Sequence, residues 1–97
     1  MTVEKVSDIT TQNLVEYLRL SEPDGEDVNT LTSLLNIAKS YIQSETGQKD
    51  LDKHSDFVIV ALILVQDMWD HRTMYVDKGN VNKVVESILG LHAVNLL

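Results

Sequence analysis

The sequence predicts an all-α protein, a small bundle of about four helices that forms one domain over residues 1–97. Three observations predict this fold: apolar residues recur at three- and four-residue steps, no segment offers a partner strand, and no break in composition divides the chain. Hydrophobic residues make up 43% of the chain and charged residues 24%, so the chain can form a folded core.

The first predicted helix is short and begins at about Thr11. Its apolar residues cluster on one face, and either Asp8 or Thr10 can cap it. Residues 20–25 follow as a surface loop, because Pro23 disfavours helical geometry in the residue before it and Asp-Gly is a turn signal.

The second predicted helix covers residues 27–46 and has the clearest amphipathic pattern in the chain. Gly47 lies just past its end, where a left-handed residue is favoured. Residues 48–55 are mostly polar and are expected to form a loop. The core residues predicted on this helix are Leu31, Leu35, Ala38 and Ile42.

The third predicted helix opens with nine apolar residues, 57–65, and continues to about Thr73. This run is too short to span a bilayer, which takes about 20 residues, and too long for an ordinary strand once its continuation is counted. One broad face is expected to form the core of the domain. The core residues predicted on that face are Ala61, Leu64, Val65, Met68 and Trp69.

The opposite face of the third helix carries Ile59, Val60 and Ile63, where a surface helix should be polar. A domain of this size has few elements with which to cover them, so a neighbouring copy of the chain is the expected cover. These three residues are therefore predicted to lie in an oligomer interface.

A last helix is predicted from about Val81, with Ile88 in the core. The segment that follows, residues 92–97, stays apolar to the final residue, which indicates that it docks on another surface. Leu96 and Leu97 are therefore assigned to the oligomer interface as well.

The sequence predicts no catalytic residue, no cofactor and no metal site. Asp67 and His71 are four residues apart on one helical face, but two ligands are too few for a transition-metal site, so a surface pair is favoured. His54 and His92 are each interpreted as isolated. The chain has no cysteine, no glycine-flanked serine and no glycine-rich loop before a helix, so an enzyme is disfavoured.

The formal net charge is −7, with 15 acidic and 8 basic residues. Proteins that bind duplex nucleic acid normally cluster their basic residues on one face, whereas here they are scattered along the chain. Sequence-specific binding to nucleic acid is therefore disfavoured. Neither a secretory signal nor a membrane anchor is expected, so a cytoplasmic origin is the default expectation.

Three segments follow one another in a distinctive order: residues 14–20, then 31–47 with Leu-Leu, Tyr-Ile and Thr-Gly landmarks, then 61–72 with its Trp and Arg. In this order and spacing the chain resembles the small head-tail connector (adaptor) family of tailed phages, also labelled as DNA-packaging proteins. The resemblance covers about residues 9–89.

The resemblance implies a structural virion protein, made in the cytoplasm of the bacterial host and located at the head-tail neck. It implies a homo-oligomeric ring between the portal protein and the tail-side neck proteins, through which DNA passes. An acidic wall would not hold DNA, and the charge has the right sign for that role. The alternative from another class is a small acidic helical adaptor or regulator that binds a basic protein partner.

Overall fold

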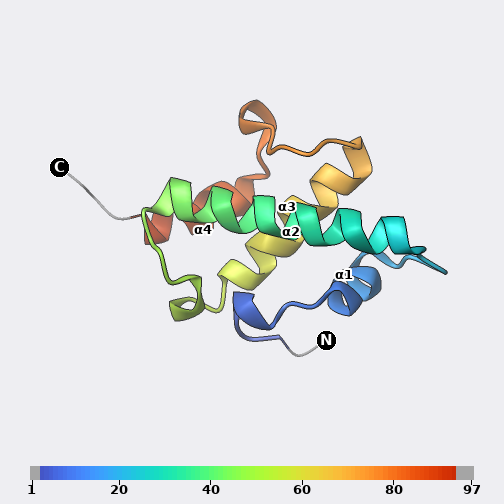
Figure 1. The fold of residues 1–97 in the computed structure, drawn as a ribbon. Coiled ribbons are helices and arrows are strands. Elements are labelled where there is room, and N and C mark those ends of the chain that lie inside the picture. Colours follow the sequence, from blue (N-terminus) through green and yellow to red (C-terminus); the bar gives the residue numbers. More distant parts are fainter. Residues whose placement is uncertain (1–2, 94–97) are drawn as a thin grey trace.

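The computed structural model describes residues 3–93 and confirms the all-α fold (Figure 1). Within these residues the chain forms four α-helices and three short 3-10 helices, with no strand. No helix in this described part is both long enough and apolar enough to cross a membrane. The elements in chain order are η1 (Val6–Asp8), α1 (Thr11–Leu18), α2 (Gly25–Thr46), η2 (Leu51–Lys53), α3 (Phe57–His71), η3 (Lys78–Asn80) and α4 (Lys83–His92).

Local side-chain hydrogen bonds set where the first two long helices begin. Thr10 caps α1 through a reciprocal pair of hydrogen bonds with Asn13. Asp24 caps α2 in the same way with Asp27, so α2 begins at Gly25, two residues before the predicted start. Each capping box provides hydrogen-bond acceptors for two backbone N–H groups at the start of the helix. These groups have no acceptor within the helix itself.

The helix ends are set by left-handed residues. Gly47 ends α2 with a φ of 72°, as the sequence predicts. Arg72 adopts a φ of 55° and ends α3 at His71, two residues before the predicted end. At the last helix, Asn82 accepts a hydrogen bond from the backbone N–H of Val84, so α4 begins at Lys83 and not at Val81.

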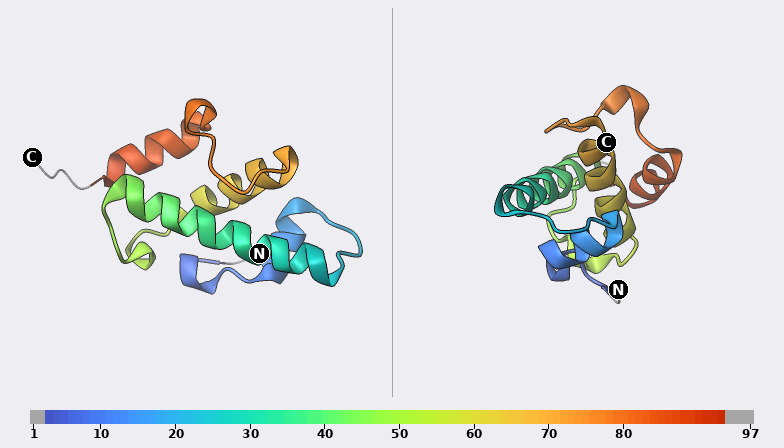
Figure 2. Two further views of the ribbon diagram at one scale, coloured as in Figure 1. Left: turned by 45° about the horizontal axis from the view of Figure 1, so that its top comes forward. Right: turned by 90° about the vertical axis from the view of Figure 1, so that its right-hand side faces the viewer.

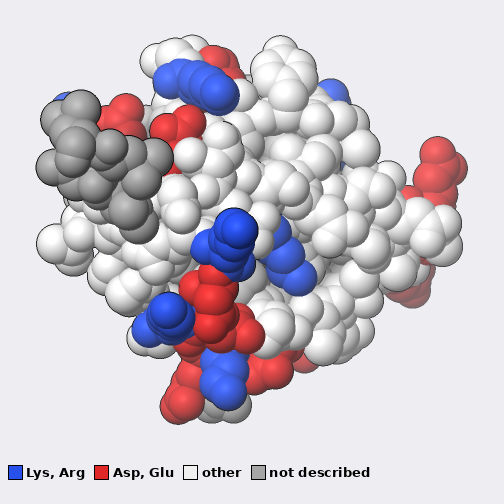
Figure 3. All heavy atoms as spheres, turned by 60° about the vertical axis from the view of Figure 1, so that its left-hand side comes forward, with Lys and Arg blue, Asp and Glu red and all other residues white. Residues whose placement is uncertain are grey.

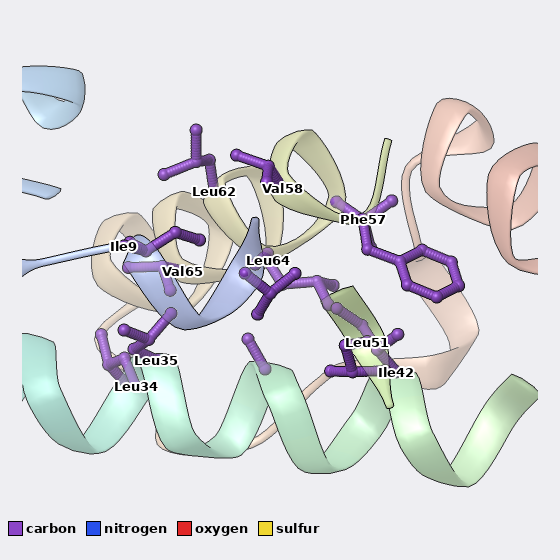
Figure 4. Packing of buried hydrophobic residues seen from close by; sticks show 14 of the residues in the cluster. Ile9, Leu34, Leu35, Ile42, Leu51, Phe57, Val58, Leu62, Leu64 and Val65 are labelled. Atoms are coloured by element: carbon purple, nitrogen blue, oxygen red, sulfur yellow. The ribbon is translucent and has the colours of Figure 1, made fainter. Parts of the chain in front are cut away.

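The centre of the bundle is α3, which lies between α2 and α4 when the molecule is viewed end-on (Figure 2). In the close view, Leu34, Leu35 and Ile42 point from α2 toward α3 (Figure 4). The predicted core residues that are buried are Leu31, Leu35, Ala38, Ile42, Ala61, Leu64, Val65 and Met68.

Two predicted core residues, Trp69 and Ile88, are only half-buried at the edge of the core. Trp69 lies in the last turns of α3, where the guanidinium carbon of Arg72 stands 5.0 Å from the centre of its ring. A surface side chain therefore covers part of the indole. Ile88 lies on α4 between the buried positions Val85 and Leu89 and the outer face of that helix.

The segment between α2 and α3 is tied to the N-terminal segment, although the sequence predicts only a loop there. Leu51 of η2 and Val6 of η1 are both buried in the core. Asp52 accepts a hydrogen bond of 3.0 Å from the backbone N–H of Ser7 and one of 2.6 Å from its hydroxyl. Residues that are 45 positions apart are thus joined by one carboxylate.

We expect Asp52→Asn to destabilise the fold at neutral pH and to matter less in acid. The two hydrogen bonds from Ser7 lower the pKa of the Asp52 carboxyl from its ordinary value of 3.8. A lowered folded-state pKa stabilises the fold above pH 3.8, and this contribution is lost as the pH falls through that value toward the folded-state pKa.

The measurement is urea unfolding of both proteins at neutral pH and in steps below pH 3.8. Asp8→Asn, on η1, is the matched control because it removes the same charge without touching the Ser7 contact. A difference in the free energy of unfolding between wild type and Asp52→Asn that stays constant across the whole pH range would contradict this account.

Candidate functional site

Of the three residues of α3 that are predicted at an oligomer interface, one is completely buried within its own chain. Ile59 is 39% exposed and Ile63 is half-buried against the core, but Val60 is 0% exposed. Its assignment to an oligomer interface is therefore corrected: Val60 is a core residue of its own chain. The physical reason is that η1 and α1, together with α2 and α4, pack on α3.

This burial changes the argument for a partner. The sequence predicts more apolar surface on α3 than one chain can cover, yet the chain covers most of it. Ile59 and the exposed parts of Ile63 and Trp69 are what remains on α3. Leu96 and Leu97, the other residues predicted at an interface, lie outside the described residues.

The larger exposed apolar surface lies on α4. Val85 and Leu89 face the core, whereas Val84 is 52% exposed and Leu91 is 76% exposed. Val84, Ile88 and Leu91 are spaced four and three residues apart, so they line one side of the helix. We call these three residues the α4 stripe. Val85 and Leu89 lie on the neighbouring side of the same helix and are buried.

A hollow of about 630 Å³ lies beside the connection between α3 and α4. Tyr75, on that connection, is largely exposed, as is its neighbour Met74. Its lining includes the buried apolar residues Leu64 and Met68 and exposed polar residues such as Asp77 and Asn80, so it can accept an apolar side chain while the polar residues stay hydrated. Its lining residues are Leu64, Asp67, Met68, His71, Thr73, Tyr75, Val76, Asp77, Asn80, Val81 and Asn82.

At one end of the molecule, the basic side chains do not gather apart from acidic ones (Figure 3). Figure 3 shows the end of the molecule where α2 and α4 terminate, and there the Lys and Arg side chains lie close to acidic ones. A wide stretch above and to the right of the centre carries no charged side chain. This face therefore offers no separate basic patch to a nucleic-acid backbone.

The predicted pair of Asp67 and His71 does not bring a carboxylate to an imidazole. His71 Nδ1 lies 2.8 Å from the backbone carbonyl oxygen of Asp67, and the ring is exposed. This contact is local to the last turn of α3. It offers no arrangement for acid-base chemistry.

His54 and His92 are not isolated, and the interpretation of each as a lone residue is wrong. Their rings stack with centroids 3.9 Å apart. His92 Nε2 also lies 2.7 Å from Asp56 Oδ2. We call His54, Asp56 and His92 the His-Asp-His group. The sequence gives no signal for it, because 36 residues separate Asp56 from His92 and only the fold brings them together.

Two features therefore stand out in residues 3–93: the apolar surfaces on α3 and α4, and the His-Asp-His group where α3 begins and α4 ends. Neither contains an activated nucleophile or a phosphate-binding loop. Compared with protein-family models, with curated proteins and with solved structures, the chain matches none of them.

Proposed function

We propose that this chain is a structural assembly protein, a phage head-tail connector that packs against copies of itself in a ring. The observation that carries the proposal is the exposed α4 stripe, where Val84 and Leu91 present large apolar side chains to water. A chain of 97 residues buries only about 60% or slightly more of its surface on folding, so added cover from a neighbour stabilises it.

A ring requires two different surfaces on each copy, because head-to-tail contacts pair unlike patches. Leu91 lies near the C-terminal end of α4, whereas Asn82, before its first turn, lines the hollow. At 1.5 Å per residue the two features are separated by roughly 14 Å along α4. We propose that Leu91 of one copy enters the hollow of the next, where Leu64 and Met68 form apolar wall.

The burial of these side chains is large enough to matter. Covering a fully exposed Leu or Val contributes about 1.5–3 kcal/mol, and the exposed parts of Val84 and Leu91 contribute a fraction of that each. Ile59 adds a further apolar contact on α3. Repeated at every interface of a closed ring, such contacts support assembly without any one of them being strong.

The surplus of acidic residues supports the role of a conduit. A net charge of −7 per copy repels the phosphate backbone, so DNA passing through a ring of such chains would not be held. This agrees with what the resemblance to connector proteins implies, namely a position between the portal and the tail-side neck proteins in the virion.

The test is co-expression with the portal protein encoded in the same genome, followed by purification and electron microscopy. We expect the chain to co-purify with the portal and to form a ring on one of its ends. Failure to bind the portal, or the lack of any portal gene in that genome, would contradict the proposal. Leu91→Asp serves as the matched variant and should reduce the ring occupancy.

A second candidate is an acidic helical adaptor or regulator that binds a basic protein, and the net charge of −7 favours it. Such a complex would form with one or two copies of the chain and would weaken steeply with added salt, because its contacts are electrostatic. Assembly through the α4 stripe is apolar and should instead persist at high salt.

A further inference from the structure

We propose that His54, Asp56 and His92 together bind a zinc ion. One ring nitrogen of each histidine and one carboxylate oxygen of Asp56 lie within 4.8 Å of one another. The three residues come from two separate parts of the chain: His54 and Asp56 precede α3, and His92 is the last residue of α4. This inference goes beyond the proposed function and does not rest on it.

The ligand set matches the chemistry of zinc. Two imidazoles and one carboxylate are a common set of three protein ligands, with a fourth, open position for water or another ligand. Zinc bonds of 2.0–2.2 Å place tetrahedral ligand atoms about 3.4 Å apart. His54, Asp56 and His92 are all partly exposed, so rotation of their side chains can close the remaining distance.

Neighbouring residues contact both histidines. Gln48 Oε1 lies 3.1 Å from His54 Nε2, and the amide nitrogen of Gln48 donates to the backbone carbonyl of His92. Phe57 packs edge-on against both rings, at 5.3 Å from His54 and 5.2 Å from His92. The contact from Gln48 to one ring nitrogen of His54 leaves the other nitrogen for a metal, and Phe57 supplies an apolar wall beside the group.

A zinc ion here would fix the end of α4 to the start of α3. Leu91, the most exposed member of the α4 stripe, directly precedes His92. Binding would therefore stabilise the native state against unfolding, since the unfolded chain does not bring the three ligands together. It would also order the end of the helix that carries Leu91.

The experiment is isothermal titration of the full chain, purified without a histidine tag, with zinc chloride. We expect one zinc ion per chain and a rise in melting temperature with added zinc that EDTA reverses. His54→Ala and Asp56→Asn should each weaken zinc binding by at least about 100-fold, since loss of an outer partner alone costs 10- to 100-fold. Asp56 makes no capping hydrogen bond to α3, so Asp56→Asn should keep the fold.

His71→Asn is the matched control, because His71 is a histidine outside the group and should leave zinc affinity unchanged. Titration with cobalt(II) provides a second readout, and the intense visible absorption of a four-coordinate ion is expected. No binding at a tenfold excess of zinc would overturn the proposal. So would an equal loss of affinity in His71→Asn and His54→Ala.

Discussion

We expect Val60→Asp to unfold the chain and Ile59→Asp to leave it folded. The two residues are adjacent on α3, but Val60 is completely buried and Ile59 faces partly outward. An unpaired charge buried at Val60 costs several kcal/mol, on the order of 4–5. That is comparable to the whole stability of a small domain, about 5–15 kcal/mol. Far-UV circular dichroism and urea unfolding measure the difference.

The pair is its own control, because both changes place the same charge in the same turn of the same helix. At Ile59 the carboxylate can reach water, so we expect a loss within about 1–2 kcal/mol. If Ile59→Asp also unfolds the chain, the outward face assigned to α3 is wrong. If Val60→Asp has the same midpoint of urea unfolding as the wild-type chain, the packing described around α3 is wrong.

We expect Leu91→Asp to weaken the proposed self-association by about 30-fold or more while the chain stays folded. The change removes an apolar contact and also places a charge in the hollow of the next copy, and a combined loss of about 2 kcal/mol corresponds to roughly that factor. Leu91 is mostly exposed in the single chain, so its loss leaves the core intact. Sedimentation velocity over a concentration series measures the effect, and circular dichroism checks the fold.

Gly90→Asp is the matched control for Leu91→Asp. It introduces the same charge one residue earlier on α4, and a Cβ at Gly90 would meet no atom within 4 Å. Both variants place an acid near the C-terminal end of α4, where the macrodipole disfavours it equally. A loss of self-association in Gly90→Asp as large as that in Leu91→Asp would mean that charge, and not the α4 stripe, controls the contact.

The sequence predicts α1 and α2 well, because each has an apolar period and a local capping residue, whereas α3 has no side-chain cap and is recognised by its length and apolar run. Thr10 and Gly47 act as predicted at the ends of α1 and α2. The predicted helix bounds are wrong by two residues where the same residues are compatible with more than one local structure. Asp24 and Gly25 read as a turn, yet Asp24 caps a helix that begins at Gly25.

The surfaces are harder to predict, since they depend on which elements meet. The sequence gives no sign that η1, a turn of three residues, packs on α3, so Val60 was assigned to a subunit interface. Val84 and Val85 are neighbours in sequence, but only the position of α4 shows that Val85 is the buried one. The His-Asp-His group and the contact between Ser7 and Asp52 depend on long-range packing in the same way.

The central claim is that this chain assembles with copies of itself through exposed apolar surfaces. Sedimentation velocity of the wild-type chain, over the widest accessible concentration range and at both low and high salt, tests it most directly. We predict a concentration-dependent shift from the 10.9 kDa chain to a closed oligomer that persists at high salt. A single species of 10.9 kDa at every concentration and salt level would contradict the account.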